Sequence, residues 1–248
     1  MREESDAMAG DKVDVPYAVK TSDLPKRLAS AAIMLGVAGA ALWLGRGVLD
    51  TLIVVVALAC LVEFVLLVVK ATRNVPFRLA AILAGTLYIA LAAFSLVSIH
   101  AVYVAAIVGL VICTDTAAYF TGRAIGGPKI APRISPSKTW AGLVGGMVAA
   151  ALWLMLAMFI LSYSISGLTG PGPSFGDTLE QGHYALAALI GAGLAVTAQA
   201  GDFFESWLKR RAGVKDSSRL IPGHGGVFDR VDGLLPVAIL AAWLMSLT

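Results

Sequence analysis

The chain has 248 residues, of which 58% are hydrophobic and only 14% are charged, with a net charge of +3. Its mean hydropathy is +0.82, and the charged share is about half that of an ordinary soluble domain, which excludes a water-soluble globule. The two cysteines, Cys60 and Cys113, lie far apart inside apolar stretches, so neither a disulfide framework nor a cysteine metal site is expected. An integral membrane protein remains, and we interpret both cysteines as packing residues.

Residues 1–25 carry several acidic side chains and lack the apolar stretch that a cleavable signal peptide needs, so we expect a disordered cytoplasmic tail. Apolar windows of about 20 residues follow, which is the length with which a helix crosses the hydrocarbon of a bilayer. They cover residues 28–45, 48–69, 79–98, 101–121, 140–163, 184–201 and 231–247. The sequence therefore predicts an all-α, polytopic integral membrane protein with about seven transmembrane helices.

The basic residues between these windows are distributed unevenly. With seven spans, 18 of the 19 Lys and Arg residues fall on one side and only Arg46 falls on the other. Basic residues collect in cytoplasmic loops, so we expect a cytoplasmic N-terminus, and an extracytoplasmic connector at 164–182, which has no basic residue. Residues 26–100 would form N-terminal transmembrane helices, and residues 101–248 would form a catalytic transmembrane domain with cytoplasmic loops.

Carboxylates inside apolar spans need a reason, because a charge at the centre of a membrane helix costs roughly 2.5–3.5 kcal/mol. Glu63 lies within the second span and has no acidic neighbour. We interpret it as a structural residue that forms a hydrogen bond to another helix. The remaining candidates belong to the cytoplasmic half of the predicted topology, so we expect a functional site there.

The richest polar segment follows the sixth span. If the helix continues past the membrane surface, its polar residues recur at i, i+3, i+4 and i+7 and share one face. They are Asp202, Glu205, Ser206 and Lys209. The alternative is an interfacial amphipathic helix whose other face supplies aromatic anchors.

A glycine-rich loop then leads into the seventh span, because the run from Pro222 to Gly226 cannot form a regular helix. Glycines let the backbone present N–H groups to anionic oxygens. Asp229 and Asp232 follow at i and i+3 in the first turn of the span, where the helix dipole alone would favour carboxylates. The helix dipole does not explain why so many acidic and basic residues gather here. Their gathering predicts a hard-cation site beside a polyphosphate site, and Mg²⁺ prefers oxygen ligands such as carboxylates.

A second polar segment lies between the fourth and fifth spans, on the same side, and begins at Asp115. Ser137 is placed to cap the fifth span, with Lys138 and Thr139 in its first turn, which would make an anion site. Neither a P-loop motif nor a Gly-x-Ser-x-Gly nucleophile motif occurs in the sequence. The phosphates are therefore not expected in a P-loop, and a simple serine hydrolase is not expected.

Three parts of the C-terminal half resemble the hallmark of phosphatidate cytidylyltransferases, also called CDP-diacylglycerol synthases. They are Ser206-Trp207-Leu208-Lys209-Arg210, Lys215-Asp216 and Pro222-Gly223-His224-Gly225-Gly226-Val227-Phe228-Asp229-Arg230-Val231-Asp232. The segments Asp115 to Arg123 and Ser135 to Trp140 also resemble the family, so the resemblance covers about Asp115 to Asp232. The resemblance implies transfer of a cytidylyl group from CTP to phosphatidic acid with release of pyrophosphate. It also implies a Mg²⁺ cofactor, with room for a second cation, and a homodimer in the bacterial inner membrane whose active site faces the cytoplasm. No nucleic-acid partner is expected.

The resemblance also implies a role for each matching residue. Asp202 and Asp229 would be the metal ligands, with Asp232 and Asp216 as further ligands or orienting groups. Phosphates would be bound by Lys209, Arg210, Lys215 and Arg230. The remaining substrate contacts would come from Asp115, Ser137, Lys138, Thr139, Ser206, His224, Gly225 and Gly226. We assign no general base to His224, because the attacking phosphate is already largely ionised near neutral pH. We expect His224 to shape the loop or contact the nucleotide, and the alternative is that it handles a proton.

Two other functions stay open at this point. A CTP-dependent lipid kinase would also place acids and lysines at a cytoplasmic membrane face. A transporter is a different class, and it would distribute polar groups across the depth of the membrane, because such groups line ion pathways. The crowding of polar residues at one face favours the enzyme.

Overall fold

The computed structural model describes residues 24–169, 183–218, 220–221 and 225–247. The expected N-terminal tail lies outside these residues except for its last two positions, where the first helix has already begun. The expected connector after the fifth span also lies mostly outside them. The sequence predictions for residues 1–23 and 170–182 therefore stay predictions, whereas residues 164–169 continue the fifth long helix instead of belonging to the connector.

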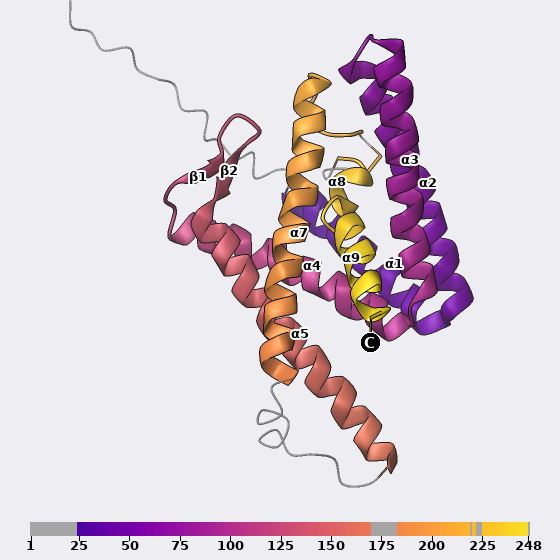
Figure 1. Ribbon diagram of the computed structural model, residues 1–248, viewed down its shortest axis with the longest axis vertical. Coiled ribbons are helices and arrows are strands. Elements are labelled where there is room, and N and C mark those ends of the chain that lie inside the picture. Colours follow the sequence, from indigo (N-terminus) through magenta and orange to yellow (C-terminus); the bar gives the residue numbers. More distant parts are fainter. Residues whose placement is uncertain (1–23, 170–182, 219, 222–224, 248) are drawn as a thin grey trace, which may run out of the picture.

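The described chain is helical almost throughout (Figure 1). Its helices are α1 (Leu24–Leu44), α2 (Arg46–Ala71), α3 (Val75–Ser98), α4 (Ala101–Ala124), α5 (Trp140–Thr169), α7 (His183–Arg211), α8 (Phe228–Val231) and α9 (Leu234–Met245). Sheet structure in the described part is limited to an antiparallel hairpin of β1 (Lys129–Ala131) and β2 (Ser135–Thr139).

Each predicted span corresponds to a helix, which confirms the all-α, polytopic membrane fold. Five helices, α2, α3, α4, α5 and α7, are long and apolar enough to cross a membrane. The first and last spans are shorter apolar helices, Ala29–Leu44 and Leu234–Met245. Helix α7 extends ten residues beyond the predicted end at residue 201, to Arg211.

Side chains satisfy backbone groups at both ends of α3. The side chain of Asn74 accepts a hydrogen bond from the backbone N–H of Phe77, and a proline in the first turn fits the start of α3. At the other end of α3, the guanidinium of Arg46 donates hydrogen bonds to the carbonyls of Leu96, Val97 and Ile99. The cation therefore satisfies carbonyl groups that a helix C-terminus leaves without partners.

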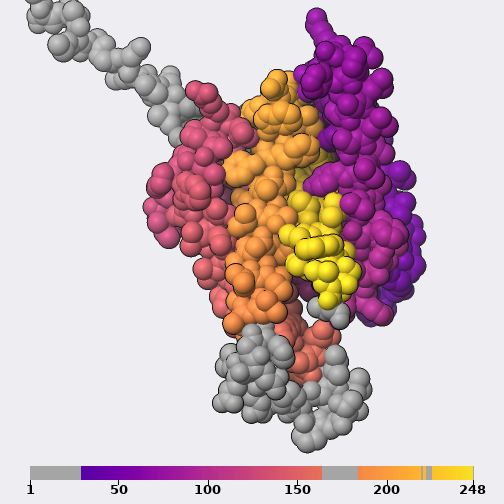
Figure 2. Space-filling view, in the orientation of Figure 1, coloured from indigo at the N-terminus to yellow at the C-terminus, as the bar shows by residue number. Residues whose placement is uncertain are grey.

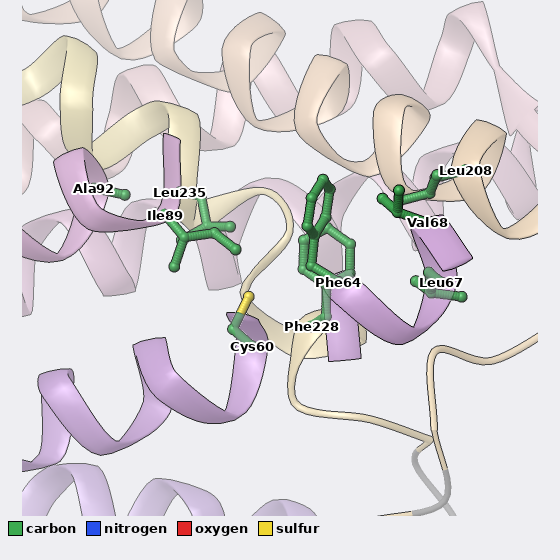
Figure 3. Close-up of a cluster of buried hydrophobic side chains, with 9 residues drawn as sticks. All are labelled: Cys60, Phe64, Leu67, Val68, Ile89, Ala92, Leu208, Phe228 and Leu235. Carbon is green, nitrogen blue, oxygen red and sulfur yellow. The ribbon is translucent and has the colours of Figure 1, made fainter. Parts of the chain in front are cut away.

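The helices form two packed groups that share α7 and α9. On one side, α2 and α3 run side by side, and α9 lies between α3 and α7 on the face shown in Figure 2. On the other side, α4 packs against α5, and α5 packs against α7. A core of buried side chains from α2, α3, α7, α8 and α9 joins the first group (Figure 3). A second core joins α4, α5, α7 and α9.

Glycines bring α4 and α5 into close contact. The four-residue spacing of Gly142 and Gly146 favours close helix packing. A Cβ added at Gly142 would lie 2.8 Å from the carbonyl oxygen of Ala118, and one at Gly146 would lie 3.1 Å from that of Thr114. The packing role predicted by the spacing is confirmed.

Two local predictions are wrong. Ser137, Lys138 and Thr139 lie in β2 rather than at the start of a helix, and the cap of α5 is the hydroxyl of Thr139, which accepts the N–H of Gly142 at 3.1 Å. Asp229 and Asp232 do not share the first turn of the last long helix. Asp229 lies in the short helix α8, and Asp232 lies in the turn between α8 and α9.

Candidate active site

A cavity of about 740 Å³ lies between α4, the β-hairpin, the C-terminal part of α7 and the segment around α8. It is lined by most of the predicted site residues, namely Asp115, Ser137, Lys138, Thr139, Asp202, Lys209, Asp216, Asp229, Arg230 and Asp232. These side chains come from segments more than 100 residues apart in sequence. The cavity is also lined by residues to which the sequence pattern assigned no role in the site, namely Tyr119, Arg123, Lys129, Gln199 and Glu205.

Helix α7 contributes one polar face to this cavity. Asp202, Glu205 and Lys209 line it, and the hydroxyl of Ser206 donates a hydrogen bond to Asp202 at 3.3 Å. The opposite face, which includes Phe204, lines a separate, mainly apolar cavity of about 690 Å³. The predicted continuation of the helix, and the sharing of one face by its polar residues, are both confirmed.

Three carboxylates at the cavity wall have the geometry of a cation site. One oxygen each from Asp202, Glu205 and Asp232 lies within 4.8 Å of the other two. Glu205 is only 1% exposed, and among the described residues its Oε1 atom has no hydrogen-bond partner. A buried acceptor beside two acidic groups is costly unless a cation or donor satisfies it. Hard oxygen ligands of this kind fit Mg²⁺.

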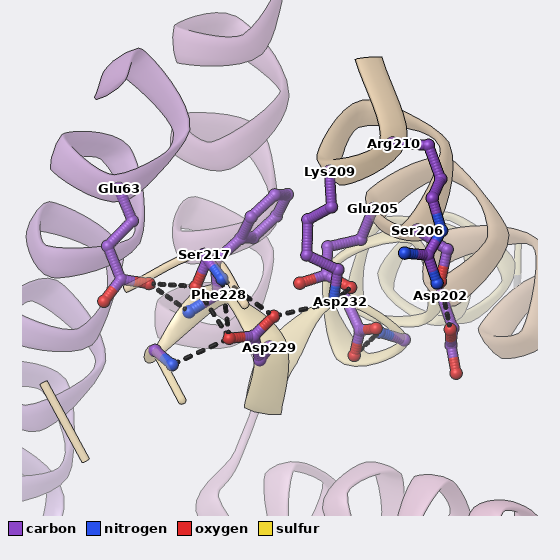
Figure 4. Close-up of polar contacts among 12 residues, drawn as sticks. Glu63, Asp202, Glu205, Ser206, Lys209, Arg210, Ser217, Phe228, Asp229 and Asp232 are labelled. Atoms are coloured by element: carbon purple, nitrogen blue, oxygen red, sulfur yellow. Dashed lines mark hydrogen bonds and ion pairs between the residues drawn. The ribbon is translucent and has the colours of Figure 1, made fainter. Parts of the chain in front are cut away.

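Lys209 connects this cluster to Asp229. Its Nζ lies 2.5 Å from Oε2 of Glu205 and 2.7 Å from Oδ1 of Asp229, and the three side chains are largely buried (Figure 4). The second Asp229 oxygen accepts the backbone N–H groups of Ser217 and Gly226, at 2.9 and 2.7 Å. Asp229 is therefore already surrounded by donors.

These contacts keep Asp229 ionised. Burial alone would raise the pKa of its carboxyl group, but contacts with Glu205 and Lys209 and the backbone N–H groups of Gly226 and Ser217 outweigh it and hold the pKa well below its usual range. Asp229 contacts Lys209 and the loop and is not one of the three clustered carboxylates, which include Asp202 and Asp232. The expected metal pair of Asp202 and Asp229 stays a prediction.

Strand β2 brings Lys138 to the same site from the other side. Its Nζ lies 2.5 Å from Oδ2 of Asp202 and donates to Oε1 of Gln199 at 2.7 Å. The ammonium also lies 5.2 Å from the centre of the Phe203 ring. Lys138 therefore contacts α7 through an ion pair, a hydrogen bond and an aromatic ring, and it places a positive charge beside the carboxylate cluster.

Some predicted site residues lie beside the cavity rather than in its lining. Arg210 is exposed and donates to the carbonyl of Ile134 at 3.3 Å, and Lys215 is exposed. His224 lies outside the described residues, so its role stays a prediction. The N–H of Gly226, expected to face an anionic ligand, is instead donated to Asp229.

The glycines of the loop are needed for its conformation. Gly225 has a φ of +85°, a left-handed conformation that strains residues with a side chain. A Cβ on Gly226 would lie 2.0 Å from the hydroxyl of Ser217 and 2.4 Å from a Glu63 oxygen. The loop therefore packs closely against α2 as well as against Asp229.

The part of the chain that contains the cavity is similar to known proteins. The model of the cytidylyltransferase family matches residues 97–248, which contain every residue lining the cavity. The phosphatidate cytidylyltransferase of Brucella suis biovar 1 (strain 1330) is 49% identical over 127 residues, which are 51% of this chain and 40% of that protein.

Two further relatives carry the same name. The phosphatidate cytidylyltransferase of Haemophilus influenzae is 45% identical over 125 residues, 50% of this chain and 39% of that protein. The phosphatidate cytidylyltransferase of Pseudomonas aeruginosa is 41% identical over 142 residues, 56% of this chain and 46% of that protein. The matched region thus covers less than half of each of these relatives. Because the family match extends over more than half of the chain and includes the whole cavity, the chain belongs to the cytidylyltransferase family.

Proposed function

We propose that the chain is a phosphatidate cytidylyltransferase. A phosphate oxygen of phosphatidic acid attacks the α-phosphorus of CTP, a new P–O bond forms, the bond to the β-phosphate breaks, and pyrophosphate leaves. The product is CDP-diacylglycerol. The observation that carries the proposal is a cavity with three clustered carboxylates and several cations, built on helices apolar enough to cross a membrane. The names of the relatives support the same reaction.

The side chains of the cavity suit this chemistry by position and charge. Transfer of a phosphoryl-type group needs little covalent help from the protein, since positioning and neutralisation of charge carry most of the catalysis. Lys138 and Lys209 are fixed by ion pairs, and Arg123, Lys129 and Arg230 line the same cavity. We infer that these cations bind the phosphates of CTP and the headgroup phosphate. No general base is required, because the second pKa of a phosphate monoester is about 6.

A divalent cation completes the proposal. Asp202, Glu205 and Asp232 would hold Mg²⁺. The strongest support for this donor set is the buried Oε1 of Glu205, which has no hydrogen-bond partner within the part of the chain that the structure describes. When bound, Mg²⁺ would neutralise phosphate charge and act as a Lewis acid toward the reacting phosphate. Asp216 also lines the cavity and is available as an orienting group.

We propose a multi-pass location in the bacterial inner membrane, with the cavity facing the cytoplasm. The uneven distribution of Lys and Arg supports this orientation. It would also give the cavity direct access to cytoplasmic CTP. The homodimer and a second cation, both implied by the resemblance, stay predictions.

The product formed from labelled CTP tests the reaction. With purified protein, phosphatidic acid, Mg²⁺ and CTP labelled at the α-phosphate, we expect the label in a lipid and one pyrophosphate released per lipid formed. A CTP-dependent lipid kinase would leave the α-label in water-soluble CDP. Solute flux in proteoliposomes without any turnover of CTP would favour a transporter and contradict the proposal.

A further inference from the structure

Glu63 on α2 is a buried carboxylate with an unusual set of partners. It is 4% exposed, within a helix whose apolar window has a mean hydropathy of 3.2. Its Oε1 accepts the hydroxyl of Ser218 at 2.6 Å and the backbone N–H of Val227 at 3.1 Å. Its Oε2 accepts the hydroxyl of Ser217 and the backbone N–H of Phe228, at 2.9 and 2.8 Å. Each oxygen thus takes one hydroxyl and one main-chain donor.

These contacts hold two parts of one segment against α2. Ser217 and Ser218 precede the glycine-rich run, and Val227 and Phe228 follow it, so a single carboxylate closes the loop between them. A buried carboxylate is costly unless it is hydrogen-bonded, and here all four donors are neutral groups of the loop and of the start of α8. The expected structural hydrogen bonds of Glu63 are therefore present, and their target is this segment.

The same segment holds Asp229 in place. The hydroxyl of Ser217 lies 2.9 Å from Oε2 of Glu63 and 2.9 Å from Oδ2 of Asp229, so one hydroxyl lies between the two carboxylates (Figure 4). The N–H groups of Ser217 and Gly226 also reach Asp229. Asp229 in turn holds Lys209 at 2.7 Å. A continuous series of contacts therefore runs from α2 to the wall of the active-site cavity.

Apolar packing supports the same attachment. Phe64, the residue after Glu63, packs edge-on against Phe228, with ring centroids 5.9 Å apart and an interplanar angle of 89° (Figure 3). Phe228 is 1% exposed and begins α8. Helix α8 is thus held against α2 by a hydrogen bond to Glu63 and by the ring contact with Phe64, and α8 carries Asp229 and leads directly to Asp232.

We propose that Glu63 is a positioning residue for the cytidylyl-transfer site, which it orders through Ser217 and the first N–H groups of α8. This inference rests on the proposed function for its catalytic effect. Glu63 lies outside residues 97–248, the part that matches the cytidylyltransferase family, so an N-terminal helix would complete a site whose lining lies wholly in the C-terminal part.

The substitution Glu63→Gln tests the proposal in the full-length protein. It keeps the shape of the side chain but replaces one acceptor oxygen by an amide group that cannot accept the N–H of Val227 or Phe228. Loss of a partner that orients site residues costs about 10–100-fold in activity or metal affinity. We expect kcat to fall by about this factor while the KM for CTP stays within about threefold. The matched control is Asp50→Asn, which also replaces a carboxylate of α2 by an amide. Asp50 pairs with Arg46, and we expect this variant to keep the wild-type kcat.

A second readout does not need the reaction. Hydrogen exchange followed by mass spectrometry reports on the backbone amides of residues 225–232, which include the two donors to Glu63. We expect these amides to exchange at least about tenfold faster in Glu63→Gln, while α2 and α7 keep their protection. In Asp50→Asn the exchange of this segment should not change.

The outcomes separate the proposal from the proposed function. Wild-type kcat and unchanged exchange in a folded Glu63→Gln protein would overturn the positioning role. If the wild type itself transfers no cytidylyl group, the proposed function fails, and the exchange readout alone decides whether Glu63 orders the segment. If Glu63→Gln does not fold, Ser218→Ala replaces it, since the Ser218 hydroxyl donates to Glu63 at 2.6 Å and lies outside the contacts given for Asp229; a fall in kcat supports the proposal and wild-type kcat overturns it.

The double variant of Glu63→Gln and Ser217→Ala tests the path through Ser217. We expect its kcat to be little lower than that of the less active single variant, and independent, multiplicative losses would contradict action through Ser217.

Discussion

Asp202→Asn should lower kcat by about 10³-fold while the protein stays folded. The substitution removes one of three clustered carboxylates and the charge partner of Lys138, which lies 2.5 Å away. A neutral amide binds a divalent cation weakly and leaves Lys138 without its ion pair. The proposed cation therefore loses one of its three carboxylates, and strand β2 loses one of the three contacts of Lys138 with α7. Steady-state rates of CDP-lipid formation over a range of Mg²⁺ concentrations measure the effect.

The matched control for this experiment is again Asp50→Asn, a carboxylate at the far end of α2 that pairs with Arg46 and does not line the cavity. It should retain the wild-type rate. A purified, folded Asp202→Asn protein that turns over at close to the wild-type rate would remove Asp202 from the site and with it the proposed cation cluster.

Lys209→Met should lower the free energy of unfolding by about 3–5 kcal/mol, the usual cost of removing one partner from a buried ion pair. Lys209 is the cation between Glu205 and Asp229, whose side chains are 2% and 5% exposed. Methionine has a similar length but leaves these two carboxylates facing each other without the charge that separates them. Equilibrium unfolding in detergent micelles measures the loss.

The adjacent residue provides the control for that measurement. Arg210 is exposed, and among the residues that the structure describes its side chain makes one hydrogen bond, to the carbonyl of Ile134. Arg210→Met should therefore change the free energy of unfolding by less than about 1 kcal/mol. Equal losses in the two variants would show that Lys209 has no special role between the carboxylates.

The positions of the helices could be predicted from the sequence because membrane spans are a property of composition and length. Each of the seven apolar windows corresponds to a helix, and five of these helices are long enough to cross a membrane. The spacing of Asp202, Glu205 and Lys209 predicted a shared face on α7 that the structure confirms. The hairpin could not be predicted in the same way. A five-residue strand that contains Pro136 has no alternating apolar pattern, and the residues before Trp140 resembled a helix cap.

In the site, too, local spacing predicted some features, and tertiary contacts determine the others. Local spacing placed Asp229 and Asp232 one turn apart, but which of them faces the cluster depends on the break after Val231, and sequence spacing does not reveal that break. The sequence placed Glu205 on the polar face of α7, but the burial of its Oε1 without a hydrogen-bond partner among the described residues results from tertiary packing. The partners of Glu63 are more than 150 residues away in sequence, so no local pattern indicates them.

The most direct test of the carboxylate cluster is the position of a bound metal. Anomalous diffraction from crystals of the protein grown with Mn²⁺, a cation that shares the oxygen ligands of Mg²⁺, should give a peak in contact with oxygens of Asp202, Glu205 and Asp232. A peak bound by Asp229 in place of Asp232, or no peak in this cavity at saturating Mn²⁺, would contradict the account.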